Sequence, residues 1–363
     1  MAKNNTELLI TREESQRISI LKLLMAFMVV FIHSYKTDIN FAGEVVAFDA
    51  PVWFEIVRFT ISEVLSRSAV PVFFFLSAYF LYRKPFSWKK NIAKKAKSIL
   101  VPYFILNTFW IVVYFICQHI PAVSSFFSNP DTIVADWGIT GWLSAFFGSA
   151  KINPMLAPLW FLRDLFIFNL LACVFGWIAD KLGHFSLAIY VLLWLFLEST
   201  GIFFMNIQGL CFWGIGCYFA KQRISLSSLD KYKKWIIIAY VCLVIATVAL
   251  RNTPGILFLS VSRLCKLVGL AFWYVCATKF EDGKTKGRLL SLSKYGFCIY
   301  LFHEMALSFT RKTFTRILPH TLPYSVALYF GIPIIIIIYC LVLSYLLDRY
   351  VPKFYGIISG GRS

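Results

Sequence analysis

Long apolar stretches alternate along this chain with short polar segments that are rich in lysine and arginine. A helix that crosses a bilayer needs about 20 mainly apolar residues, and ten stretches approach or reach that length. The predicted spans are residues 18–35, 68–82, 98–120, 158–178, 185–202, 206–221, 234–250, 256–278, 294–311 and 325–348. The pattern therefore predicts an all-α fold, a polytopic membrane helix bundle of about ten transmembrane helices, in a single domain over residues 1–363.

Three segments depart from the simple span-and-loop pattern. The sixth predicted span is short and contains several glycines, which let neighbouring helices approach closely, so we expect an interior helix. Residues 51–66 mix apolar and charged side chains, which favours an amphipathic helix at the interface. The longest outside segment, 121–157, is rich in aromatic residues and is expected to dip into the interface or to form part of an acceptor groove.

The basic residues predict the orientation of the bundle. Of the 36 lysines and arginines, 24 lie in alternate segments, eight in the opposite segments and four within spans. Loops on the cytoplasmic side carry such an excess, so both termini are predicted to be cytoplasmic. The N-terminal segment is then 1–17 and the tail is 349–363. This topology accounts for the formal charge of +18, and no nucleic-acid partner is expected.

Composition supports a membrane protein. Hydrophobic residues make up 59% of the chain and charged residues only 15%, against about a quarter in soluble domains, so lipid must cover part of the apolar surface. The nine cysteines are scattered through apolar segments without a CxxC pair or a Cys/His ligand spacing. We therefore expect neither a disulfide framework nor a metal site.

Lys22 and His33 form the sharpest pair of ionisable residues inside a predicted span. Residues eleven apart on a helix differ by only about 20° from three full turns, so both project from one face, about 16 Å apart along the axis. Imidazole can deprotonate a hydroxyl near neutral pH, which makes His33 the candidate base. A buried structural histidine and a snorkelling lysine are the alternatives. Asp38 follows His33 at H-x-x-x-x-D spacing and could orient the ring.

A basic run precedes the third span and includes Lys94, Lys95 and Lys97. Lys94 and Lys97 would share a helix face and could clamp a phosphate of a nucleotide-bearing donor. The alternatives are positive charge that sets the membrane topology, or contact with lipid headgroups.

Arg163 and Asp164 lie in the outer half of the fourth span. Since adjacent residues do not face each other on a helix, we expect each to find a partner on another helix. This pairing is either structural or part of a polar cavity that holds the acceptor or the transition-state charge.

Two weaker candidates follow in the eighth and ninth spans. Arg263 and Lys266 share a helix face, and two cations in lipid require an anion, either a substrate phosphate or a carboxylate. His303 and Glu304 fall in the middle of the ninth span. No G-x-S-x-G, Walker A or H-E-x-x-H motif is present, so serine hydrolysis, ATP-driven transport and zinc chemistry lack support.

Four segments, in this order, resemble the acyltransferase 3 family of bacterial integral-membrane O-acyltransferases. They are Lys22 to His33 as [R/K]-x10-H, 70–79 as V-P-x-F-F-x-L-S-G-[FY], 159–162, and 293–303 as S-x-x-x-[FI]-Y-x-x-H. Ala78 replaces the usual glycine, and the R-x-x-R before the third span appears only as lysines, with Ser98 at an arginine position. Lysine keeps the charge but loses the bidentate geometry of arginine.

The resemblance implies a multi-pass enzyme of the bacterial cytoplasmic membrane. Acyl-CoA, with acetyl-CoA the expected form, would be the donor, and a hydroxyl of a cell-surface or lipid-linked glycan the acceptor. His33 would be catalytic with Lys22 as its cytoplasmic partner, and we expect Arg163 to stabilise charge. Two alternatives stay open. One is a transporter or flippase with intramembrane His and Arg groups, and the other is a different membrane acyltransferase fold that uses His303.

Overall fold

A computed structural model describes residues 11–35, 39–41, 44–46, 50–129, 132–148, 153–197, 205–253, 255–281, 283–318 and 321–361. This part of the chain is almost entirely helical, as predicted. The exception is one antiparallel hairpin, β1 (Ile39–Phe41) and β2 (Glu44–Val46).

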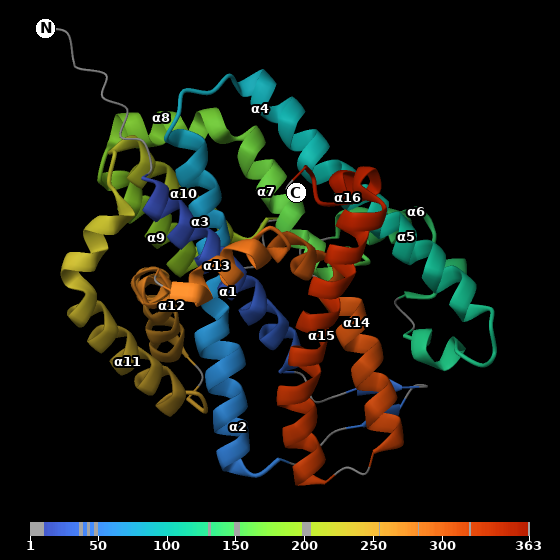
Figure 1. The fold of residues 1–363 in the computed structure, drawn as a ribbon. Helices are drawn as coiled ribbons and strands as arrows, with labels where there is room; N and C mark the ends of the chain where they lie inside the picture. The colour runs from blue at the N-terminus through green and yellow to red at the C-terminus, as the bar shows by residue number, and fades with distance from the viewer. Residues whose placement is uncertain are drawn as a thin grey trace, which may run out of the picture.

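Sixteen α-helices make up the described chain (Figure 1). They are α1 (Arg12–Ser34), α2 (Val52–Arg58), α3 (Ala69–Tyr82), α4 (Trp88–Lys95), α5 (Val101–Gln118), α6 (Ile139–Phe147), α7 (Trp160–Leu170), α8 (Ala172–Leu182), α9 (Phe185–Leu197), α10 (Ile207–Lys221), α11 (Lys233–Ala249), α12 (Ile256–Cys276), α13 (Gly283–Ser293), α14 (Gly296–Ile317), α15 (Leu322–Tyr350) and α16 (Pro352–Ile358). Short π- and 3₁₀-helical segments connect several of them.

Six helices of the described chain are long and apolar enough to cross a bilayer, or seven when the bent pair α7–α8 counts as one. The predicted number of about ten is therefore not confirmed. The sixth predicted span, α10, has only 15 residues. The ninth, α14, has 22 residues but also carries Glu304, Arg311, Lys312 and Arg316. Several apolar helices in one chain make it a multi-pass membrane protein.

The segment 51–66 is not a separate interfacial helix. It forms the first half of a continuous helix, Val52–Tyr82, in which α2 passes through a π-helical turn (Phe59–Leu65) and a 3₁₀ turn (Ser66–Ser68) into α3. The π-helical turn contains Glu63 and the 3₁₀ turn contains Arg67. Both residues therefore lie midway along a long helix.

The fourth predicted span is broken. The axes of its two halves, α7 and α8, meet at 61°. A break frees carbonyl oxygens that then need other donors. Tyr82 donates its hydroxyl to the Ala172 carbonyl at 2.6 Å, and Trp88 donates its indole N–H to the Leu170 carbonyl at 2.9 Å. Trp88 of α4 thus satisfies a carbonyl at the end of α7, and Tyr82 of α3 ties the first turn of α8 to the bundle.

The core is built around α1, which lies in the middle of the bundle and contacts α3, α12, α14 and α15 (Figure 1). The glycine-rich helix α10 packs closely along α3 and against α9. Eleven of its 15 residues are buried, so the expectation of an interior helix is confirmed. Gly216 lies directly against the Phe75 carbonyl oxygen of α3, where a Cβ atom would collide with backbone.

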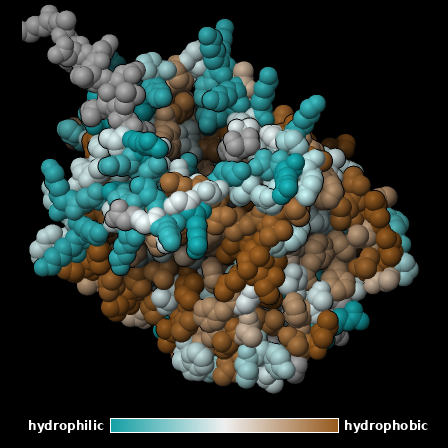
Figure 2. Space-filling model, viewed as in Figure 1, coloured by the Kyte–Doolittle hydropathy of each residue, from teal (hydrophilic) through white to brown (hydrophobic). Residues whose placement is uncertain are grey.

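The surface separates into polar and apolar regions (Figure 2). Hydrophilic residues gather over the upper part of this face, and hydrophobic residues form a broad band below them. Large apolar side chains are exposed along α11, α12 and α15, among them Trp235, Ile256 and Ile338. An apolar surface of this extent suits contact with lipid tails.

The close approach of α10 to α3 gives a direct test of the packing. Gly216→Ala should lower the free energy of unfolding by about 1–3 kcal/mol, because the added methyl group meets a backbone carbonyl that cannot move aside. Gly331→Ala in α15 is the control, since a Cβ there meets nothing within 4 Å. Thermal melting of both variants in detergent measures the difference. Equal melting temperatures would contradict this packing.

Candidate functional site

His33 lies in the last turn of α1 and faces α14. Its Nδ1 atom is 3.4 Å from a carboxylate oxygen of Glu304, within ion-pair distance. The two side chains are 29% and 24% exposed, so both are accessible yet largely enclosed. Asp38, expected as a possible partner of the ring, lies outside the described residues. Glu304 takes that place because α1 packs against α14.

His303 lies behind this pair. Its ring centroid is 5.1 Å from that of His33, and its side chain is fully buried. Ligand atoms of His33, His303 and Glu304 all lie within 4.8 Å of one another. This spacing is compatible with a metal ion, so the expectation of no metal site stays a prediction.

Two cavities meet at His33. The first has a volume of about 400 Å³ and the second about 670 Å³. Both are bordered by Ile32, His33, Glu63, Arg67 and Trp160. Residues of the outside segment 121–157 line the second cavity: Phe126, Phe127, Asn129, Thr132, Asn153 and Ala157. The imidazole therefore lies where two spaces adjoin.

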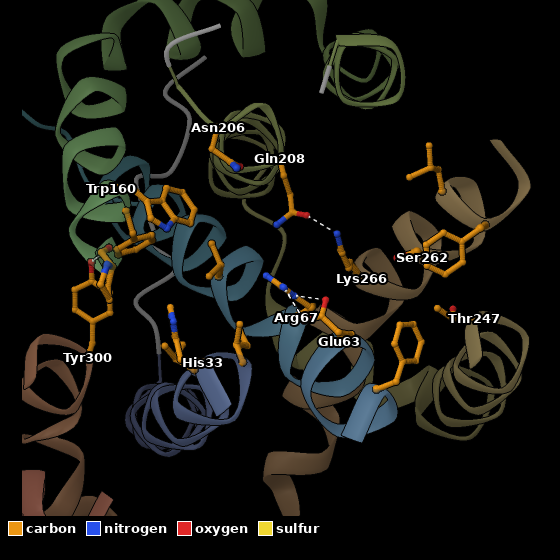
Figure 3. A pocket seen from close by; sticks show the side chains of 18 residues that line it. His33, Glu63, Arg67, Trp160, Asn206, Gln208, Thr247, Ser262, Lys266 and Tyr300 are labelled. Atoms are coloured by element: carbon orange, nitrogen blue, oxygen red, sulfur yellow. Dashed lines mark hydrogen bonds and ion pairs between the residues drawn. The ribbon is translucent and has the colours of Figure 1, made fainter. Parts of the chain in front are cut away.

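The first cavity combines aromatic and polar walls (Figure 3). Trp160 and Tyr300 lie beside His33, while two polar pairs lie across the cavity. Arg67 donates to Glu63 at 2.7 Å, and Lys266 donates to Gln208 at 2.9 Å. The cavity thus offers charged, amide and aromatic groups within reach of one bound molecule.

The expectation that Arg163 and Asp164 pair only with residues of other helices is wrong. The Arg163 Nε atom is 2.8 Å from an Asp164 carboxylate oxygen, so these adjacent residues do pair with each other. The long arginine side chain bends around the helix, which the argument from helix geometry neglected. Arg163 also donates to the Phe147 carbonyl at 2.6 Å, and Asp164 accepts from the Asn206 backbone N–H at 2.8 Å. The pair ties α7 to the ends of α6 and α10, and neither residue lines the two cavities.

Arg263 and Lys266 diverge in their contacts, although they share one face of α12. Arg263 is nearly buried and donates to the Leu195 carbonyl of α9 at 3.0 Å. Lys266 lines the first cavity. Both cations lie over the ring of Trp194, at 5.9 and 6.0 Å from its centroid.

The remaining cations lie away from His33. Lys22 is exposed, and its ammonium lies 5.4 Å from the ring centroid of Phe80 on α3. Lys94 and Lys97 are exposed and Lys95 is half-buried, near the junction of α4 with the π-helical turn Ala96–Leu100. The structure therefore brings His303 next to His33 and Lys266 to the same cavity as His33, and leaves the other predicted cations at separate places.

Sequence reasoning missed most of the cavity lining. The residues added by the structure are Glu63, Arg67, Trp160, Asn206, Gln208 and Tyr300. Glu304 was named as a candidate beside His303, but its pairing with His33 was not predicted. Glu63 falls in the segment 51–66 that was predicted to be an interfacial helix, and Arg67 falls just before the second predicted span, so neither was expected at the site.

Comparison with known proteins gives two matches. The family model of the acyltransferase 3 domain, described as an acyltransferase domain, matches residues 16–349. The succinoglycan biosynthesis protein ExoH of Rhizobium meliloti (strain 1021) is 27% identical over 362 residues, covering 96% of this chain and 93% of ExoH. No solved structure was found to match the chain.

The contacts of Asp164 predict a structural role. Asp164→Asn should lower the free energy of unfolding by about 3–5 kcal/mol, because it removes the anion from a buried ion pair. The control is Asp180→Asn, whose pair with Lys221 is exposed and worth at most about 1 kcal/mol. Thermal melting and specific activity are measured together. A variant that melts normally but loses activity would instead place the pair in the chemistry.

Proposed function

Because the chain belongs to the acyltransferase 3 family, we propose that it is an O-acyltransferase of the bacterial cytoplasmic membrane. It takes an acyl group, acetyl in the first instance, from acyl-CoA and places it on a hydroxyl of a cell-surface or lipid-linked glycan. The observation that carries this proposal is His33 beside Glu304 at the meeting point of two cavities.

The proposed reaction is a direct attack of the acceptor on the thioester. His33 takes the proton of the acceptor hydroxyl, and the oxygen forms a bond with the acyl carbonyl carbon. The tetrahedral intermediate collapses with cleavage of the carbon–sulfur bond. The thiolate then takes the proton from His33, so the products are the ester and the free thiol. Glu304 orients the ring and stabilises the imidazolium that forms.

The first cavity supplies the acceptor site in this proposal. Sugars present both apolar faces and several hydroxyl groups, which suits a wall of Trp160 and Tyr300 opposite Gln208 and Lys266. The name of the relative ExoH refers to biosynthesis of a polysaccharide, which supports a glycan as the acceptor class.

The donor is proposed to bind from the opposite end of the bundle, which we assign to the cytoplasm. The exposed Lys94 and Lys97 would hold its phosphates, with Lys95 beside them. Lys22 lies part of the way along α1, between this end and His33. The pantetheine arm would follow α1 to the imidazole, a distance of about 16 Å beyond Lys22.

Transport without covalent change is the alternative, with the intramembrane His and Arg groups binding substrate or protons. It predicts movement of the glycan without ester formation. Membership of an acyltransferase family favours the enzyme.

His33→Ala should reduce acyl transfer by about 10²–10⁴-fold, because general base catalysis contributes about that much. His119→Ala is the control, since His119 is exposed at the end of α5 and lines neither cavity. The assay measures transfer from labelled acetyl-CoA to surface glycan, with correct membrane insertion checked for each variant. Full activity of an inserted His33→Ala protein would remove the assignment.

Replacing Lys94 and Lys97 together by glutamine should raise the KM for acyl-CoA about tenfold, equal to about 1.4 kcal/mol, with little change in kcat. The matched control replaces Lys234 and Lys284, which are also exposed and remove the same charge from other helices. Initial rates of purified protein at several donor concentrations give the KM and kcat of each variant. Equal effects of the two double variants would mean that only the overall charge matters.

A further inference from the structure

The contacts of His303 determine which of its ring nitrogens carries the proton. This residue has no role in the reaction described above. Its Nδ1 atom lies 2.9 Å from the carbonyl oxygens of both Ile299 and Tyr300, one helical turn earlier in α14. Carbonyl oxygens only accept hydrogen bonds, so Nδ1 must carry the proton. In the neutral ring the other nitrogen, Nε2, is therefore an acceptor.

This acceptor nitrogen is buried and has no hydrogen-bond partner among the described residues. A buried polar atom without a partner destabilises a fold, so such an atom calls for an explanation. His303 lines neither cavity, so the acceptor glycan does not reach it in this arrangement. The nearest ring that can change its protonation state is that of His33, at 5.1 Å between centroids.

Three acceptor groups thus surround one small space. They are the ring nitrogens of His33 and His303 and the carboxylate of Glu304, all within 4.8 Å of one another. Groups that all carry lone pairs are held together best by a shared positive species, such as the N–H of an imidazolium.

We propose that His303 is a positioning residue for His33, whose imidazolium it stabilises together with Glu304 during acyl transfer. This role rests on the proposed function. When His33 takes the acceptor proton at one nitrogen, the N–H at its other nitrogen faces the Glu304 carboxylate and the Nε2 lone pair of His303. The proton later leaves from the first nitrogen to the thiolate, so His303 itself gains and loses no proton.

Other charged and titratable groups surround His33 and line the two cavities that it borders, and they contribute to any pH effect on His33. Arg311 of α14 donates to the His33 carbonyl at 3.2 Å. The further groups around the two cavities are Tyr35, Glu63, Arg67, Tyr114, Lys266, Tyr300 and Lys312. None of them is altered by a substitution at His303, so they are constant between the variants compared.

The test compares His303→Phe, which keeps a ring but removes the acceptor, with His303→Gln, which keeps an acceptor oxygen. A less stabilised imidazolium makes His33 a weaker base that is protonated only at lower pH. His303→Phe should therefore lower the maximal rate about tenfold and move the half-maximal point of the rising pH–rate curve to lower pH. His303→Gln should retain a curve near that of the unmodified protein. Melting temperature and membrane insertion are measured for both variants.

The following results would overturn the role of His303 or the proposed function. If His303→Phe and His303→Gln show the same pH–rate curve, whether or not it is that of the unmodified protein, His303 is only a packing residue and the proposal fails. If the purified protein holds one equivalent of metal by elemental analysis, and His303→Phe loses it, the cluster is a metal site and the proposal also fails. An active His33→Ala protein would overturn the proposed function itself. An inactive His33→Ala protein with an unchanged curve for His303→Phe overturns the role of His303 alone.

Discussion

The approach of His33 to Glu304 depends on the packing of α1 against α14, and the proposed chemistry depends on that approach. An imidazole in an apolar bundle is an effective base only if a neighbouring group stabilises its protonated form. Glu304, at 3.4 Å, provides such a group from a different helix. His33 and Glu304 are 271 positions apart in the sequence, so the way α1 packs against α14 sets the reactivity of the site.

The ionisable residues His33 and Lys22 lie at different depths along α1. His33 lies at the end of this helix where two cavities meet, whereas Lys22 lies about 16 Å away towards the basic end. Arg17, near the start of α1, fixes that end by pairing with Asp230 at 2.8 Å and with Glu281. A helix anchored at one end and carrying a base at the other suits a reaction whose donor and acceptor come from opposite sides.

Hydropathy predicted the helical membrane fold because apolar composition alone decides whether a segment can enter lipid. The glycines of α10 likewise predicted an interior helix, since only close packing against α3 rewards small residues there. The break between α7 and α8 had no local signal. The carbonyl freed at Leu170 is satisfied by Trp88, and Tyr82 donates to the first carbonyl of α8, and both donors lie on other helices.

The site was only partly predictable, because its contacts also join residues of different helices. His33 and Lys266 stood out because ionisable residues within spans are costly. The partners that decide their roles, Glu304 and Gln208, come from other helices and depend on tertiary register. Arg163 misled the prediction because a long, flexible side chain can reach its own neighbour, which helix periodicity does not describe.

The proposed reaction requires the imidazole of His33 to contact the acceptor hydroxyl that attacks the acyl carbon. A structure of the protein in complex with a non-hydrolysable acyl-CoA analogue and an acceptor sugar would test it most directly. We expect the acceptor hydroxyl within hydrogen-bond distance of a His33 ring nitrogen, about 2.6–3.2 Å, and the acyl carbon about 3–3.5 Å from that oxygen. A complex in which both ligands bind away from His33, or in which its ring faces lipid, would contradict it.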